Sequence, residues 1–195
     1  EGIFTHEERF DLMESTEFWD TLSLAIQQVT SAAMRELNRN NIDFLIADKY
    51  YLDRGKIGSN DRDVKITIND HDFSAIVLPP ACVISHVVSA KLLAFAEKGG
   101  VVLLLGATPE GSPEKGMKDP AIIRQMTALK RLPNVIDLSG DKDRLNKMVT
   151  ALNERIRPQI RLENSGRLYT AHRRISNSHL YWLANNSDTV RNFSA

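Results

Sequence analysis

Residues 73–106 decide the fold of this chain, and they read FSAIVLPPACVISHVVSAKLLAFAEKGGVVLLLG. Two largely apolar runs, 74–78 and 101–105, flank an amphipathic segment that begins near Ser85. This pattern predicts a buried strand, a helix and a second buried strand, with Gly99-Gly100 ending the helix in a left-handed cap. A strand, a helix and a strand in this order form a parallel pair joined by a crossover helix.

The segments that follow the two predicted strands carry little chemistry. Sheets of this type place their working groups beyond the carboxyl ends of the strands. Those ends read Leu78-Pro79-Pro80 and Gly106-Ala107-Thr108-Pro109, without a nucleophile, a metal-ligand cluster or a phosphate loop. The glycines of 106–111 (GATPEG) match neither the dinucleotide fingerprint nor the P-loop. The sequence therefore indicates a fold more clearly than a catalytic centre.

Further elements are predicted on both sides of this unit. Helical spacing, Asp N-caps and Pro terminators predict helices over 16–40, from Asp119-Pro120 onward and from Asp141 to Pro158. Short apolar or alternating runs predict strands over 42–47, 64–68 and 135–138, with a loop over 49–63. The predicted fold class is α/β, with a mostly parallel sheet flanked by helices.

The pattern changes after Pro158. Short alternating runs at 160–162, 167–173 and 179–183 replace the helical spacing. We therefore predict a boundary near residues 157–160, with an α/β domain over 1–158 and a β-strand segment over 159–195. Two or three strands bury too little to form a β-sandwich alone, so this segment either packs on the α/β body or opens a further domain.

The composition limits the classes of partner. The 195 residues carry 25 Lys+Arg and 25 Asp+Glu, so the net charge is zero and gives no argument for nucleic acid or an anionic membrane. No apolar run approaches membrane-spanning length, and residues 1–6 show no signal-peptide pattern. We expect neither a nucleic acid nor a membrane partner. Because the chain opens on Glu1, we expect a processed product or an excised piece.

Cys82 is the one cysteine, and it lies where a strand leads into a helix. A nucleophile elbow needs small flanking residues, whereas the sequence here is Pro80-Ala81-Cys82-Val83. We therefore favour an inert, buried thiol over a nucleophile. Cys82 and His86 are four residues apart and could share a helix face, but zinc needs three or four ligands, so no metal site and no cofactor is predicted.

Two segments are candidates for the rim of a neighbouring domain's pocket. Asp48, Tyr50 and Tyr51 follow the predicted strand 42–47, and tyrosines beside a carboxylate are a common sugar-facing surface. Thr108 and Glu110 follow the strand 101–105. We assign these five residues a binding role at the pocket rim and no catalytic role.

Three segments resemble one group of proteins. They are Asn41-Ile42-Asp43-Phe44, the 72–106 block and residues 169–187, YTAHRRISNSHLYWLANNS. Together they resemble the middle and C-terminal region of large bacterial glycoside hydrolases of the α-L-rhamnosidase type. The α/β part also resembles the class I glutamine amidotransferase-like domain that occurs as the β-galactosidase trimerisation domain. Such domains usually keep a flavodoxin-like sheet and lose the amidotransferase chemistry.

The resemblance implies a flavodoxin-like sheet over 1–158, and the start of a truncated β-sandwich over 159–195. It implies that the catalytic carboxylates belong to a barrel upstream, so no catalytic residue is expected in this chain. The implied role is a structural, accessory domain in carbohydrate degradation, in a periplasmic or secreted enzyme. The implied partners are other domains of the same polypeptide and a second subunit, with carbohydrate bound only through the whole enzyme.

One alternative from a different class stays open. The chain would then be a small self-sufficient hydrolase or amidotransferase-like enzyme, with Cys82 as nucleophile and His86 or His71 as base.

Overall fold

The computed structural model describes residues 16–60, 63–156, 168–176, 178–185 and 188–190. The chain divides into two compact units, which are treated separately: Glu1–Thr30 with Ala47–Arg144, and Ser31–Ile46 with Leu145–Ala195. The described elements are, in chain order, α2 (Thr16–Arg39), α3 (Lys49–Arg54), β1 (Lys56–Asn60), β2 (Asp63–Ile68), β3 (His71–Phe73), β4 (Ala75–Leu78), α4 (His86–Glu97), β5 (Val101–Leu104), α5 (Pro120–Lys130), β6 (Val135–Asp137), α6 (Arg144–Arg155), β7 (Leu168–Ile175) and β8 (Ser178–Asn185).

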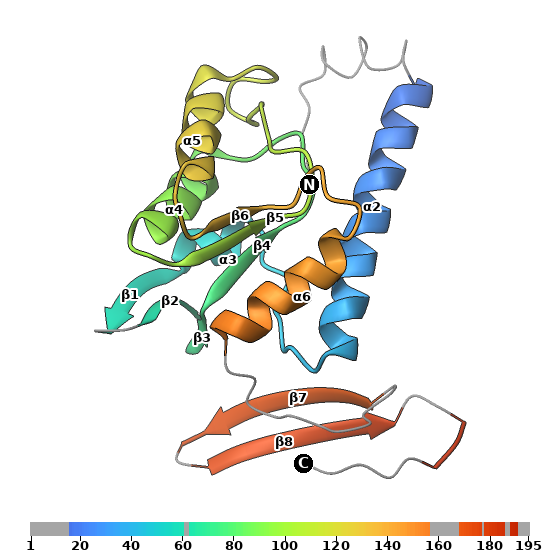
Figure 1. The fold of residues 1–195 in the computed structure, drawn as a ribbon. Coiled ribbons are helices and arrows are strands. Elements are labelled where there is room, and N and C mark those ends of the chain that lie inside the picture. Colours follow the sequence, from blue (N-terminus) through green and yellow to red (C-terminus); the bar gives the residue numbers. More distant parts are fainter. Residues whose placement is uncertain (1–15, 61–62, 157–167, 177, 186–187, 191–195) are drawn as a thin grey trace. The chain divides into compact units, whose positions relative to one another are not determined.

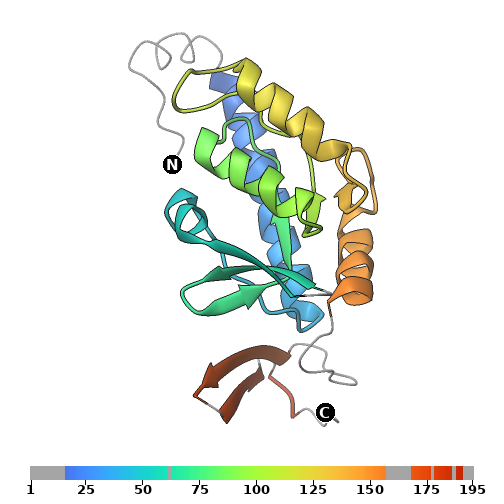
Figure 2. The same cartoon turned by 90° about the vertical axis from the view of Figure 1, so that its left-hand side faces the viewer.

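The first unit is built on a parallel sheet in the order β4-β5-β6. The crossover helices α4 and α5 pack against each other beside this sheet (Figures 1 and 2). Ser89 Oγ, on α4, donates a hydrogen bond to Gln125 Oε1, on α5, over 2.5 Å. The predicted parallel pair and its crossover helix are confirmed, and the molecule is a mixed α/β protein.

The central strand β5 carries the core of this unit. Val102 and Leu104 belong to a buried apolar cluster that also contains Phe95 of α4 and Ile122 of α5. The alternate residue Leu103 is also completely buried, so both faces of β5 are covered, as the run of apolar residues predicted.

A second, antiparallel sheet, in the order β1-β2-β3, adds to the same core. Asn69 and Asp70 form its β2–β3 turn with positive φ angles of 49° and 64°. Asn and Asp tolerate this left-handed conformation better than most residues. Ile66 and Ile68 of β2 then enter the buried cluster beneath α4.

The helix ends follow local sequence signals. The Ser85 side chain caps the N-terminus of α4 by accepting a hydrogen bond from the Val88 amide. At the other end Gly99 has a φ of 99°, and the Gly100 and Gly99 amides donate to the carbonyls of Phe95 and Ala96. These two bonds are those of a Schellman cap, so the predicted helix end is confirmed.

The second unit contains the end of α2, most of α6 and the two-stranded antiparallel sheet β7-β8. Met148 and Leu152 on α6 are buried. Arg173 on β7 forms an exposed ion pair with Asp43 over 3.3 Å. The two hairpin strands confirm the predicted strands over 168–173 and 179–183. Residue 167, the predicted strand 160–162 and the predicted boundary at 157–160 lie outside the described residues.

Some expectations were wrong. Residues 42–47 form no strand: Ile42 instead donates to the Leu37 carbonyl as part of the α2 cap, and Leu45 and Ile46 are exposed. An apolar run becomes a strand only where a neighbouring strand pairs with it, and no strand in the part of the chain that the structure describes pairs with this run. The predicted loop 49–63 holds α3, β1 and the first residue of β2. Strand β4 is half-buried, not fully buried, and α6 begins at Arg144, not at Asp141.

No helix among the described residues is both long enough and apolar enough to cross a membrane.

Replacing Gly100 with alanine tests the close packing at the end of α4. A Cβ at Gly100 would lie 2.5 Å from the ring of Phe95, which is completely buried and cannot move aside. We expect Gly100→Ala to lower the free energy of unfolding by about 1–3 kcal/mol in denaturant titrations. Gly58→Ala, on β1, is the control: a Cβ at Gly58 would have no atom within 4 Å, so this variant should leave the free energy of unfolding nearly unchanged. Equal effects of the two variants would contradict this packing.

Candidate functional site

The loops that follow β4 and β5 lie side by side beyond the carboxyl ends of these strands. The Ala81 amide donates to the Ala107 carbonyl over 3.1 Å. The Gly111 amide donates to the Cys82 carbonyl over 3.1 Å, and the Ile84 amide donates to the Gly111 carbonyl over 3.0 Å. The edge where an α/β enzyme places its catalytic groups is therefore closed by main-chain hydrogen bonds between neighbouring loops.

The carboxylate of Asp119 joins this edge to two helices. Asp119 is the N-cap of α5, and its Oδ1 accepts a hydrogen bond from the Ala121 amide over 2.9 Å. Its Oδ2 accepts the Ser112 hydroxyl over 2.6 Å and lies 2.5 Å from Nε2 of His86, the first residue of α4. The Asp119 amide donates to the Glu110 carbonyl over 2.7 Å. We call Asp119, Ser112 and His86 the Asp119 clamp.

The clamp keeps a buried charge in place. Asp119 is 1% exposed, and a buried carboxylate must be paired and hydrogen-bonded to stay ionised. The hydrogen bond from Ser112 is the largest influence on the Asp119 pKa; together with the bonds from His86 and Ala121 it outweighs burial and holds that pKa well below its usual range.

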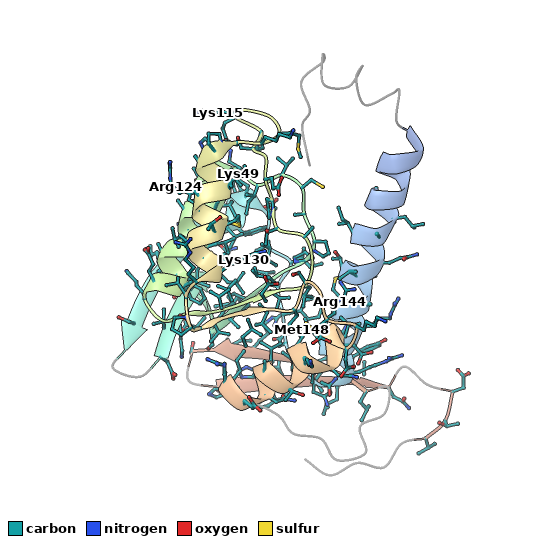
Figure 3. The ribbon with its side chains drawn as sticks, turned by 45° about the horizontal axis from the view of Figure 1, so that its top comes forward. Lys49, Lys115, Arg124, Lys130, Arg144 and Met148 are labelled. Carbon is teal, nitrogen blue, oxygen red and sulfur yellow. The ribbon has the colours of Figure 1, made fainter. Side chains whose placement is uncertain are left out.

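The clamp has the parts of a catalytic triad in a different order. In a triad the hydroxyl donates to the histidine, and the carboxylate lies behind the histidine. Here Ser112 and His86 both bond to the same oxygen of Asp119. Ser112 Oγ also accepts the Lys115 amide over 3.0 Å, and Lys115 lies on the loop at the N-terminal end of α5 (Figure 3). His86 is thus oriented by an acid, but no hydroxyl of a described residue donates to its imidazole.

Cys82 lies in the bend before α4 and not on the helix, so the expectation that it shares a helix face with His86 was wrong. Burial raises the pKa of the Cys82 thiol, which disfavours the reactive thiolate. The thiol makes no hydrogen bond to any residue that the structure describes. His71, the other candidate base, is exposed on β3. Among the described residues, no three His, Cys, Asp or Glu side chains gather as a metal site.

The first group of predicted rim residues lies on and before α3. Asp48 is the N-cap of this helix, with its Oδ1 accepting the Tyr50 and Tyr51 amides over 2.9 and 3.2 Å. The guanidinium of Arg54 lies 3.7 Å from the centre of the Tyr50 ring. Tyr50 is 56% exposed, so the ring has one occupied face and a large accessible surface.

The second group lies on the loop after β5. Thr108 is half-buried, and Glu110 is exposed with its main chain bonded to Cys82 and Asp119. No hydrogen bond, ion pair or ring contact among the described residues joins this group to the tyrosines. A shared pocket rim therefore stays a prediction.

Polar groups beyond β5 and β6 are also engaged in structural contacts. Arg144 Nη1 donates to the Leu105 carbonyl over 3.0 Å. Burial alone would raise the pKa of Asp137, but hydrogen bonds from Ser139 and the nearby Lys130 ammonium, 3.3 Å away, lower it. Both contacts fix the ends of strands; neither leaves a group poised for proton transfer.

No protein-family model, curated protein or solved structure matches this chain. The contacts of Asp119 with Ser112, His86 and the Ala121 amide are those of a structural clamp.

The sequence singled out two of the three clamp residues, Asp119 and His86, without placing them together. Sequence reasoning recognised Asp119 as a helix cap and considered His86 as a ligand or base, and it did not consider Ser112. A usable signal was present: Ser85 and Asp119 cap consecutive crossover helices, and such helices start at the same edge of a parallel sheet. This placement brings the two helix starts together.

Replacing Asp119 with asparagine tests the clamp through its pH dependence. Because the folded pKa of Asp119 lies below its unfolded value of about 3.9, the ionised carboxylate stabilises the fold above roughly pH 4, and this contribution is lost as pH falls through the folded pKa. We expect Asp119→Asn to be clearly less stable than wild type at pH 7, and the difference to shrink below about pH 4. Thermal unfolding of the two proteins at several pH values measures the stability difference at pH 7 and its decrease in acid.

Asp53→Asn is the matched control, because Asp53 is exposed on α3. The thermal stability of Asp53→Asn should equal that of wild type across the same pH range. A difference between Asp119→Asn and wild type that stays constant from pH 7 to strong acid would show that the carboxylate is not a stabilising charge.

Proposed function

We propose that this chain is a non-catalytic accessory domain of a multidomain bacterial glycoside hydrolase of the α-L-rhamnosidase type, where it supports the catalytic barrel or subunit assembly. The Asp119 clamp is the observation that carries the non-catalytic part of this proposal, whereas the group of enzymes is proposed from the resemblance of residues 41–44, 72–106 and 169–187. The clamp uses the imidazole, hydroxyl and carboxylate at the sheet edge to hold loops and helices together, which favours a scaffold over a catalyst.

The strand order supports a flavodoxin-like class for the first unit. In the order 2-1-3-4-5, the last three strands are sequential and parallel, as β4, β5 and β6 are. Ligands bind such sheets where the strand order reverses. The three described parallel strands contain no reversal, which agrees with a scaffold role for this part of the sheet.

The β7-β8 hairpin supports a role in assembly. The register places Tyr169, Ile175, Leu180 and Trp182 on one face, and all four are exposed. Two strands alone are marginally stable in water, and exposed apolar groups of this size mark surfaces that pack against other protein. Other domains of the same polypeptide are the partners that we propose.

The alternative, a hydrolase that uses Cys82, has one observation in its favour. Asp119 orients the His86 imidazole as an acid orients the base of a nucleophilic enzyme. The raised pKa of the thiol and the absence of a Cys82–His86 hydrogen bond among the described contacts weigh against it.

The rate of Cys82 alkylation distinguishes the two proposals. We expect iodoacetamide to react with the folded chain more slowly than with the chain in denaturant, with an apparent thiol pKa above the ordinary value of about 8.5. We also expect no turnover of aryl glycosides by this chain. Fast alkylation at neutral pH that His86→Gln slows would favour the hydrolase. Glycoside turnover that one carboxylate substitution abolishes would refute the accessory role.

A further inference from the structure

Two histidines face each other on the β7-β8 hairpin. His172 lies opposite Tyr181, and His179 lies opposite Arg174, two pairs further along the ladder. His172 and His179 are therefore diagonal neighbours on the same face of the two-stranded sheet. Strand pairing, not a chance meeting of loops, brings them together.

The ring nitrogens of the two histidines converge. His172 Nε2 lies 2.8 Å from His179 Nδ1. The ring planes differ by 12° and the ring centres are 5.0 Å apart. The ring centres are almost as far apart as the nitrogen–nitrogen distance allows, so the two nearly coplanar rings meet edge to edge with their nitrogens pointing at each other. The contact is therefore an N–H···N hydrogen bond in which the accepting ring is neutral. The Tyr181 ring, centred 4.6 Å from that of His172, restricts the imidazole from one side.

We propose that His172 and His179 form a two-histidine binding site for a divalent transition-metal ion. The ion takes the place of the proton between the two nitrogens. A neutral donor ring keeps its proton by moving it to its other ring nitrogen, whereas a protonated donor ring releases one proton to solvent. Metal–nitrogen bonds of about 2.0–2.1 Å at a tetrahedral angle put the nitrogens roughly 3.3 Å apart. The rings need to separate by only a few tenths of an ångström, and water completes the coordination because the pair is exposed. This inference does not depend on the proposed function.

The chemistry of the pair sets its selectivity. Imidazole nitrogen suits Cu²⁺, Ni²⁺ and Zn²⁺, whereas Mg²⁺ and Ca²⁺ need oxygen ligands. Cu²⁺ should bind most tightly of the divalent first-row ions. Arg173 follows His172 in β7, so it lies on the other face of the hairpin, where it is paired with Asp43. With two protein ligands, the site is exchangeable and is distinct from a closed structural metal site.

Copper titration of the full chain tests the proposal. We expect one Cu²⁺ to bind with an electron paramagnetic resonance spectrum of two coordinating nitrogens, and Mg²⁺ not to compete. His172→Gln and His179→Gln should each weaken binding by about tenfold or more and reduce the spectrum to one nitrogen. Binding should also weaken as pH falls, because protons compete for the imidazoles.

His71→Gln is the matched control, since His71 is an exposed histidine on another sheet and should not affect binding. Circular dichroism checks that each variant is folded. A wild-type spectrum without two coordinating nitrogens would overturn the proposal without reference to any variant. Unchanged copper affinity in the folded His172→Gln, His179→Gln double variant would overturn it as well.

Discussion

The buried carboxylate of Asp119 is the interaction on which the carboxyl edge of the parallel sheet depends. Its two oxygens bond to the start of α5, to Ser112 in the preceding loop and to His86 at the start of α4. A buried charge is costly unless such partners are present, so the same bonds that stabilise the carboxylate also fix the two helices and the loop. Many α/β proteins place their active site at this edge of the sheet. Here the polar side chains at the edge hold α4, α5 and the loop before α5 together.

Elements with local signals could be predicted from the sequence. Ser85 and Asp119 mark helix starts by side-chain capping, Gly99-Gly100 marks a helix end by its conformational freedom, and the apolar run 101–105 marks a strand that is covered on both faces. Each of these signals involves only a few neighbouring residues, so the helix end or strand that it marks can be predicted without knowledge of the rest of the chain. The coarse α/β class follows from the order of these elements.

Features that depend on distant partners could not be predicted in the same way. The run 42–47 has the composition of a strand, but none of the described strands pairs with it, while the largely polar residues 56–60 become β1 because β2 pairs with them. The contact between His86 and Asp119 joins positions 33 residues apart and exists only because two crossover helices start at one edge. The sequence around Asp119 predicts a helix cap. Its bonds to His86 and Ser112 could not be predicted, because they require the starts of α4 and α5 to lie at the same edge of the sheet.

Amide hydrogen exchange in the loop 107–119 is the measurement that tests the central claim most directly. If the Asp119 clamp makes this edge a rigid part of the scaffold, the Gly111 and Asp119 amides, which donate to the carbonyls of Cys82 and Glu110, should exchange about as slowly as the amides of β5. Exchange of these two amides at nearly unprotected rates, while β5 stays protected, would show a loop that opens independently and would contradict the account.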